Sequence, residues 1–158
     1  MRSISLRNHQ RARSINSPVI RLLTRYLLDT ILGLRSYELR IHFIACKNMA
    51  AMNQRYLQHE GSTDVITFDY QEGYPEMSAD QKRELWGEVF ISVEDAVRQG
   101  LEFETTWKDE LVRYIIHGVL HLRGYDDVTP GKRKIMKKKE DQLLRELSNA
   151  FDLRKVGR

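Results

Sequence analysis

The sequence predicts a single α/β domain over residues 1–158, in which a small mixed sheet of about four strands is covered by helices. Short stretches of alternating apolar and polar residues are typical of strands, and other stretches repeat their apolar residues at helical spacing. The two kinds of stretch are interleaved, with no linker-like segment and no internal repeat. The length suits one domain with its own hydrophobic core.

The N-terminal part contains two expected strands and one helix. Ile4 and Leu6 alternate with polar neighbours, as in a short half-buried strand. A helix then begins at Ser17, which can cap it, and Pro18, which suits a first helical position. Residues 37–43 alternate strictly and form the clearest strand in the chain.

The middle of the chain combines short helices, strands and one polar loop. The expected elements are a helix over 48–57, a strand over 65–70, an acidic loop over 71–82 and a strand over 87–91. The first of these helices is predicted to bury Met49, Met52 and Tyr56. Ser92 can cap another short helix, which Gly100 closes.

Two longer helices, over 107–122 and 130–147, are expected near the C-terminus. Thr106 and Asp109 have the spacing of a capping box for the first. The second begins with a basic run over residues 132–139, and its lysines either contact phosphate groups or form an ordinary solvated face. The sequence leaves both readings open. Residues 150–158 are expected to form a loose basic tail.

Composition predicts a soluble cytoplasmic protein. No apolar run approaches the roughly 18 residues that a membrane span needs, and the N-terminus lacks the apolar block of a signal peptide. The single cysteine, Cys46, excludes an internal disulfide and fits a reducing compartment. A net charge of +4 and a pI near 9.2 only mildly favour a polyanionic partner.

The residues that predict chemistry are two histidines in the helix over 107–122. His117 and His121 are four positions apart, so their side chains point about 40° from each other, outside the apolar arc of the helix. Gly124 then permits a sharp turn that could bring Asp126 or Asp127 back to the same point. Two imidazoles and a carboxylate, with a fourth position left to water, are the ligands of a catalytic zinc site.

Other readings of this pattern remain. Histidines four positions apart can be structural residues that hydrogen bonds satisfy. Gly118 stands where the metalloprotease motif H-E-x-x-H has its glutamate, so a protease of that kind would lack its general base. The donor set also suits nickel, manganese or iron.

Three sequence blocks resemble one family. Residues 117–127, HGVLHLRGYDD, resemble the signature H-G-x-L-H-L-x-G-Y-D-H of the YbeY family, bacterial endoribonucleases of rRNA maturation. Residues 62–68, STDVITF, and 86–92, WGEVFIS, are similar to its blocks P-T-D-V-L-S-F and L-G-D-I-x-I-S. Order and spacing agree, and the resemblance covers roughly residues 35–147.

The resemblance implies a single α/β domain of the zinc-hydrolase type with one zinc ion per chain. Carried over by position, the metal ligands are His117, His121 and Asp127, with Asp126 the nearby competitor. The implied activity is single-strand-specific endoribonuclease cleavage in 3′-end maturation of 16S rRNA and in ribosome quality control. The implied partners are ribosomal RNA and the small ribosomal subunit; neither DNA nor a membrane is expected.

Two departures from the family pattern affect the mechanism. The third histidine of the family is Asp127 here, which can still ligate a metal through oxygen. The place of an arginine thought to contact the scissile phosphate falls on Leu57, with Arg55 and His59 nearby.

No catalytic residue is therefore assigned from the sequence. His59 is a candidate general base, and attack by the 2′-hydroxyl of the RNA is another route. The alternatives to the endoribonuclease are a ribosome-assembly factor that binds RNA and holds a structural metal, and a different metallohydrolase.

Overall fold

The computed structural model describes residues 1–57, 63–72, 76–78 and 83–158. Its elements in chain order are β1 (Arg2–His9), α1 (Ser17–Tyr26), a π-helical turn (Leu27–Ile31), β2 (Tyr37–Ile44), α2 (Cys46–Leu57), β3 (Val65–Asp69), β4 (Leu85–Ser92), α3 (Val93–Glu102), α4 (Trp107–Leu122), α5 (Pro130–Ala150) and a 3-10 turn (Leu153–Val156). The predicted α/β class is confirmed.

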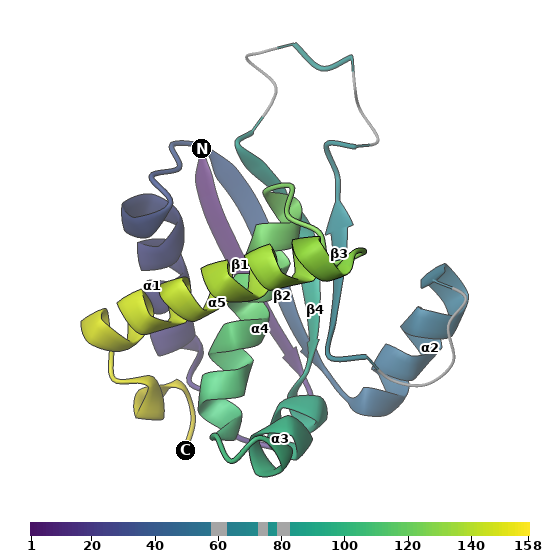
Figure 1. Ribbon diagram of the computed structural model, residues 1–158, viewed down its shortest axis with the longest axis vertical. Coiled ribbons are helices and arrows are strands. Elements are labelled where there is room, and N and C mark those ends of the chain that lie inside the picture. Colours follow the sequence, from purple (N-terminus) through teal and green to yellow (C-terminus); the bar gives the residue numbers. More distant parts are fainter. Residues whose placement is uncertain (58–62, 73–75, 79–82) are drawn as a thin grey trace.

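The described strands form one mixed sheet in the order β1-β2-β4-β3 (Figure 1). β1, β2 and β4 are parallel, and β3 pairs with β4 in the antiparallel sense. Because side chains alternate between the two faces of a sheet, Val89 of β4 faces the main core and Phe90 faces away from it. Helices α1 and α4 cover the Val89 face, and α2 packs on the Phe90 face.

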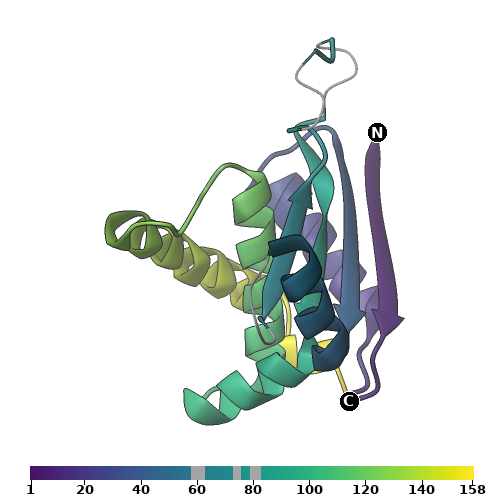
Figure 2. The same ribbon diagram turned by 90° about the vertical axis from the view of Figure 1, so that its right-hand side faces the viewer.

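Helix α4 is the centre of the core. It lies so close to β4 that a Cβ atom added to Gly118 would meet Cγ1 of Val89 at 2.6 Å. Helix α5 crosses α4 on its outer side and extends beyond it, away from the sheet (Figure 2). The two histidines therefore lie on the largely buried helix α4, next to the much more exposed helix α5.

Side-chain caps fix where several helices begin. The Oγ1 atom of Thr106 accepts a hydrogen bond from the Asp109 backbone N–H at 3.0 Å, as its spacing predicts. Ser92 caps α3 in the same way, but α3 continues past Gly100 to Glu102. The capping residue of α1 is Asn16, one position before the predicted Ser17.

The loose basic tail expected over residues 150–158 is wrong. Helix α5 runs to Ala150, and the turn that follows places Val156 fully inside the core. The backbone N–H of Asn16 donates to the Val156 carbonyl oxygen at 2.8 Å. Leu153 and Val156 are separated by two basic residues, and burial of these two apolar side chains holds the segment down.

The burial expected for α2 is confirmed for Met49 but not for Tyr56. Met49 is fully buried, whereas Tyr56 is 54% exposed because it lies in the last turn of the helix, with its ring edge-on to Phe68. In the part of the chain that the structure describes, no helix is both long enough and apolar enough to cross a bilayer.

Candidate functional site

The two predicted histidines of α4 point at a common position. The Nε2 atoms of His117 and His121 lie 3.0 Å apart, and each side chain is 25% exposed. Their neighbours on the helix are buried on both sides, including Ile116, Gly118 and Leu120. Packing of this helix therefore fixes both imidazoles while one side of the pair stays accessible.

Asp127 is brought to the same position by the loop between α4 and α5. Gly124, with a φ of 97°, reverses the chain directly after the helix. One carboxylate oxygen of Asp127 then lies 3.8 Å from Nε2 of His117 and the other lies 3.9 Å from Nε2 of His121. The structure thus unites the three predicted side chains, with one donor atom from each inside 4.8 Å of the others.

The neighbouring Asp126 is occupied elsewhere. Its carboxylate accepts a hydrogen bond from the Val128 backbone N–H at 3.2 Å and pairs with the Lys132 ammonium group at 3.2 Å. The hydrogen bond from Val128, followed by the contact with Lys132, holds the pKa of Asp126 below its usual range. Asp126 is thus engaged by the loop and by Lys132 of α5, and Asp127 is the acid that faces the histidines.

The three donor atoms fit a small divalent ion. A tetrahedral zinc ion, with bonds of about 2.0–2.1 Å, holds two ligand atoms about 3.3–3.4 Å apart. The two Nε2 atoms are 3.0 Å apart, and each lies 3.8 or 3.9 Å from a different oxygen of Asp127, so the separations bracket that value. The side chain of Asp127 is 46% exposed, so a position for water or substrate stays open on the outer side.

Glu140 is a member of the site that the sequence reading did not single out. It lies on α5, only 8% exposed, and one carboxylate oxygen is 2.5 Å from Nδ1 of His117. Its other oxygen faces the Arg113 guanidinium at 3.7 Å. A carboxylate on the far nitrogen of a ligating histidine fixes the ring and leaves Nε2 free for a metal.

The two imidazoles differ in basicity. Burial works against the charged form of His117, but the hydrogen bond and charge of Glu140, aided by other acids, outweigh it and raise its pKa. Burial, followed by the adjacent His117, lowers the pKa of His121. His121 is therefore the more readily neutral of the pair, and protons compete with a metal ion more strongly at His117.

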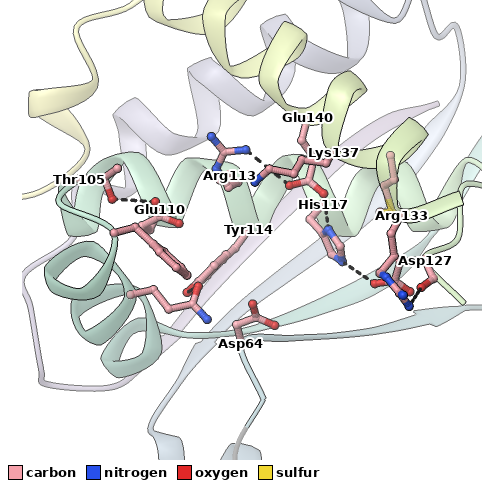
Figure 3. A pocket seen from close by; sticks show the side chains of 13 residues that line it. Asp64, Thr105, Glu110, Arg113, Tyr114, His117, Asp127, Arg133, Lys137 and Glu140 are labelled. Carbon is pink, nitrogen blue, oxygen red and sulfur yellow. Dashed lines mark hydrogen bonds and ion pairs between the residues drawn. The ribbon is translucent and has the colours of Figure 1, made fainter. Parts of the chain in front are cut away.

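His117 and Asp127 open into a cleft of about 490 Å³ between α3, α4 and α5 (Figure 3). Its lining includes Asp64, Phe103, Tyr114, Arg133, Lys137 and Glu140. Asp64, directly before β3, also accepts a hydrogen bond from the Val65 backbone N–H at 2.9 Å. Asp64 lines the same cleft as His117 and Asp127.

Leu57, at the family arginine position, and Arg55 are not among the residues that line this cleft. Leu57 ends α2 with 44% of its surface exposed, and the Arg55 guanidinium lies over the Tyr56 ring. His59, the candidate general base, is outside the described residues. The basic side chains that do line the cleft are Arg113, Arg133 and Lys137.

A mixed sheet under a helix with two histidines, and a carboxylate returned by the next loop, define a small α/β protein with a candidate metal centre in an open cleft. The chain belongs to the YbeY family: the family described as "Endoribonuclease YbeY" matches residues 5–148. A curated relative of that name from Salinibacter ruber is 31% identical over 141 residues, 89% of each chain.

Two further matches agree with this assignment. A relative from Bacteroides fragilis, also named Endoribonuclease YbeY, is 42% identical over 114 residues, 69% of this chain and 76% of its own. The solution structure of TM1509 from Thermotoga maritima has a TM-score of 0.63 and 22% identity, and the match covers 93% of this chain and 90% of that one. The structural match shows the fold.

Proposed function

We propose that the protein is a zinc-dependent endoribonuclease that cleaves single-stranded ribosomal RNA, in 3′-end maturation of 16S rRNA and in quality control of the small subunit in the cytoplasm. The observation that carries this proposal is the convergence of His117, His121 and Asp127 at the wall of an open cleft. Membership of a family whose curated relatives are named endoribonucleases supports it.

A divalent ion held there supplies Lewis acidity toward a phosphate oxygen and toward water. Glu140 holds the His117 ring through Nδ1, so that Nε2 keeps its direction toward the other donors. Asp127 contributes one negative charge, so two histidines and one aspartate leave a divalent site at a net charge of +1 rather than the +2 of three neutral histidines. That charge still favours an anionic phosphodiester.

The second candidate is an RNA-binding assembly factor with a structural metal. Leu57, in the place of the family arginine, favours it because a phosphate contact is lost there. The exposure of the site favours the enzyme. Structural zinc sites are closed by four protein ligands, whereas among the described residues three donors converge and Asp127 is 46% exposed.

Metal content and cleavage, measured on the same preparations, test the proposal. Untagged wild-type protein is expected to contain about one zinc per chain and to cut an unstructured rRNA fragment. His121→Ala and Asp127→Ala are expected to lose both properties. Asp126→Ala removes the same charge one position away and is expected to keep both, because Asp126 faces Val128 and Lys132.

The outcomes separate the candidates. Zinc without cleavage in the wild type would favour the assembly factor. A wild type that takes up no zinc, or an Asp127→Ala variant that keeps its zinc, would contradict the proposed centre.

A further inference from the structure

We propose that the cleft is a binding groove for single-stranded RNA, in which the Phe103 ring stacks on an unpaired base and Arg133 and Lys137 hold the phosphates. This inference rests on the proposed function and names the residues that would give it strand selectivity. All three side chains line the same cleft as His117 and Asp127.

Phe103 is an exposed aromatic side chain that lines the cleft. It is 59% exposed, so its ring contributes little to the hydrophobic core. Sequence-tolerant proteins that bind single strands combine a positively charged groove with aromatic rings on which bases stack. Phe103 supplies the ring. Three basic side chains line the same cleft, and with the divalent ion of the proposed function their charge outweighs that of its four acids, Asp64, Glu110, Asp127 and Glu140.

The backbone around Phe103 is firmly held. Its N–H donates to the Gln99 carbonyl oxygen at 2.9 Å, and the next turn is closed by Thr105 N–H to the Gly100 carbonyl oxygen at 2.9 Å. A Cβ atom at Gly100 would lie 3.0 Å from the backbone of Thr106, so the chain folds tightly over this glycine. A ring on such a turn is presented with little loss of backbone freedom on binding.

The opposite rim is basic at the start of α5. Arg133 reaches from α5 to Asp127, where its Nη1 atom donates to the backbone carbonyl oxygen at 3.2 Å (Figure 3). This contact places a guanidinium group beside a candidate metal ligand. Lys137 follows one turn later on the same side of the helix, also in the cleft.

The charge of α5 is not explained by helix stability. Acidic residues stabilise the first turn of a helix, and α3 and α4 both have them there. Helix α5 has none in its first turn, and Lys132, Arg133 and Lys134 follow at once. Positive charge at this end opposes the helix dipole, and a polyanionic ligand offsets that cost.

Two acids of the cleft are already engaged by the protein. Glu110 accepts a hydrogen bond from the Thr105 hydroxyl at 2.7 Å, and Glu140 is bound to His117.

Along α4 the cleft extends from Glu110 to His117, about 10 Å of helix. That length takes roughly three nucleotides at a stacked repeat of about 3.4 Å. A base inside a duplex has no free face for Phe103, so the groove selects single strands.

Fluorescence anisotropy of a labelled, unstructured oligoribonucleotide of about 12 nucleotides tests the groove. Zinc-loaded full-length protein is titrated on ice, and a denaturing gel confirms intact RNA. Phe103→Ala is expected to weaken binding about 5- to 150-fold. Phe103→Trp retains a stacking surface and is expected to bind like the wild type. Leu101→Ala is the matched control, because Leu101 is 80% exposed and outside the cleft.

Salt dependence tests the basic rim. Lys137→Gln is expected to reduce the slope of log affinity against log salt by about 0.7, the value for one phosphate contact on a single strand. Lys138→Gln makes the same charge change at an exposed position outside the cleft and is expected to change the slope much less.

Equal binding by Phe103→Ala and Leu101→Ala, with a wild type that binds and cleaves, would overturn the groove and leave the nuclease intact. Stronger wild-type binding to the annealed duplex would overturn it as well. A zinc-loaded wild type that neither binds nor cleaves the single strand would instead sink the proposed function itself.

Discussion

Helices α4 and α5 both contribute to the cleft, yet they differ in how much of each helix is buried. Of the 16 residues of α4, ten are buried, whereas only four of the 21 residues of α5 are buried. α4 lies between the sheet and α5, and α5 has solvent on its outer side (Figure 2). The proposed ligands His117 and His121 are on the more buried helix, and the basic residues Arg133 and Lys137 are on the more exposed one.

This difference separates two requirements of a hydrolytic site. Ligand geometry needs side chains held to within a fraction of an ångström, which close packing supplies. Attraction of a long anionic substrate needs charge at a distance, which an exposed helix face supplies. Glu140 is where the helices meet, because it belongs to α5 but is buried against His117 of α4.

The largest expected effect comes from truncating an isoleucine on each helix. Ile115 of α4 is fully buried, and Ile115→Ala should lower the free energy of unfolding by about 2–5 kcal/mol through lost burial and a cavity. Ile135 of α5 is 63% exposed, and Ile135→Ala should change it by no more than about 0.5 kcal/mol. Urea denaturation measures both. A similar loss of unfolding free energy in the two variants would contradict the difference in burial between α4 and α5.

The contact between the two helices gives the next effect. Glu140→Gln keeps the side-chain volume but removes the charge that orients His117, so zinc affinity should fall about 10- to 100-fold. Competition with a chromophoric chelator measures this change. Glu146→Gln, an exposed position on the same helix, is the control and should bind zinc like the wild type. If both glutamine variants bind equally, Glu140 has no role in metal binding.

Glycines provide the smallest and sharpest comparison. Gly118→Ala forces a methyl group against Val89 and should cost about 1–2 kcal/mol net of the gain in helix propensity. At Gly131 of α5 an added Cβ atom meets nothing within 4 Å, so Gly131→Ala should stabilise the protein by up to about 1 kcal/mol. Thermal melts of the two variants should therefore shift in opposite directions, and shifts of the same sign would contradict this account.

Much of the fold could be predicted because local signals and packing agree. Residues 107–122 form a helix as expected, since the capping Thr106 and the apolar arc point to the same boundaries. The tail over 150–158 was misjudged because its basic residues mask the burial of Leu153 and Val156, which only the core reveals. Tyr56 is the opposite case: it was expected to be buried, but its position in the last turn of α2 leaves the ring exposed.

Some residues of the candidate site could likewise be predicted from the sequence, and others could not. His117 and His121 could be predicted because their spacing along one helix is local. The spacing left Asp126 and Asp127 open, and the family resemblance favoured Asp127. Glu140 could have been suspected, because it shares helical spacing with the buried Met136, Leu143 and Leu147. Phe103 left no such signal. Its nearness to α5 depends on how α3 and α5 pack against α4, which no local pattern encodes.

The segment between β1 and α1 is joined to the C-terminal residues. Asn16 donates to Val156, Arg158 donates to Ser14, and Ile15 forms a bridge with Gly157, so contacts close between positions about 140 residues apart. Such contacts carry a high loop-closure entropy and form late. During translation, the segment that leads into α1 therefore has to wait for residue 156 to emerge from the ribosome, and the core is completed only then.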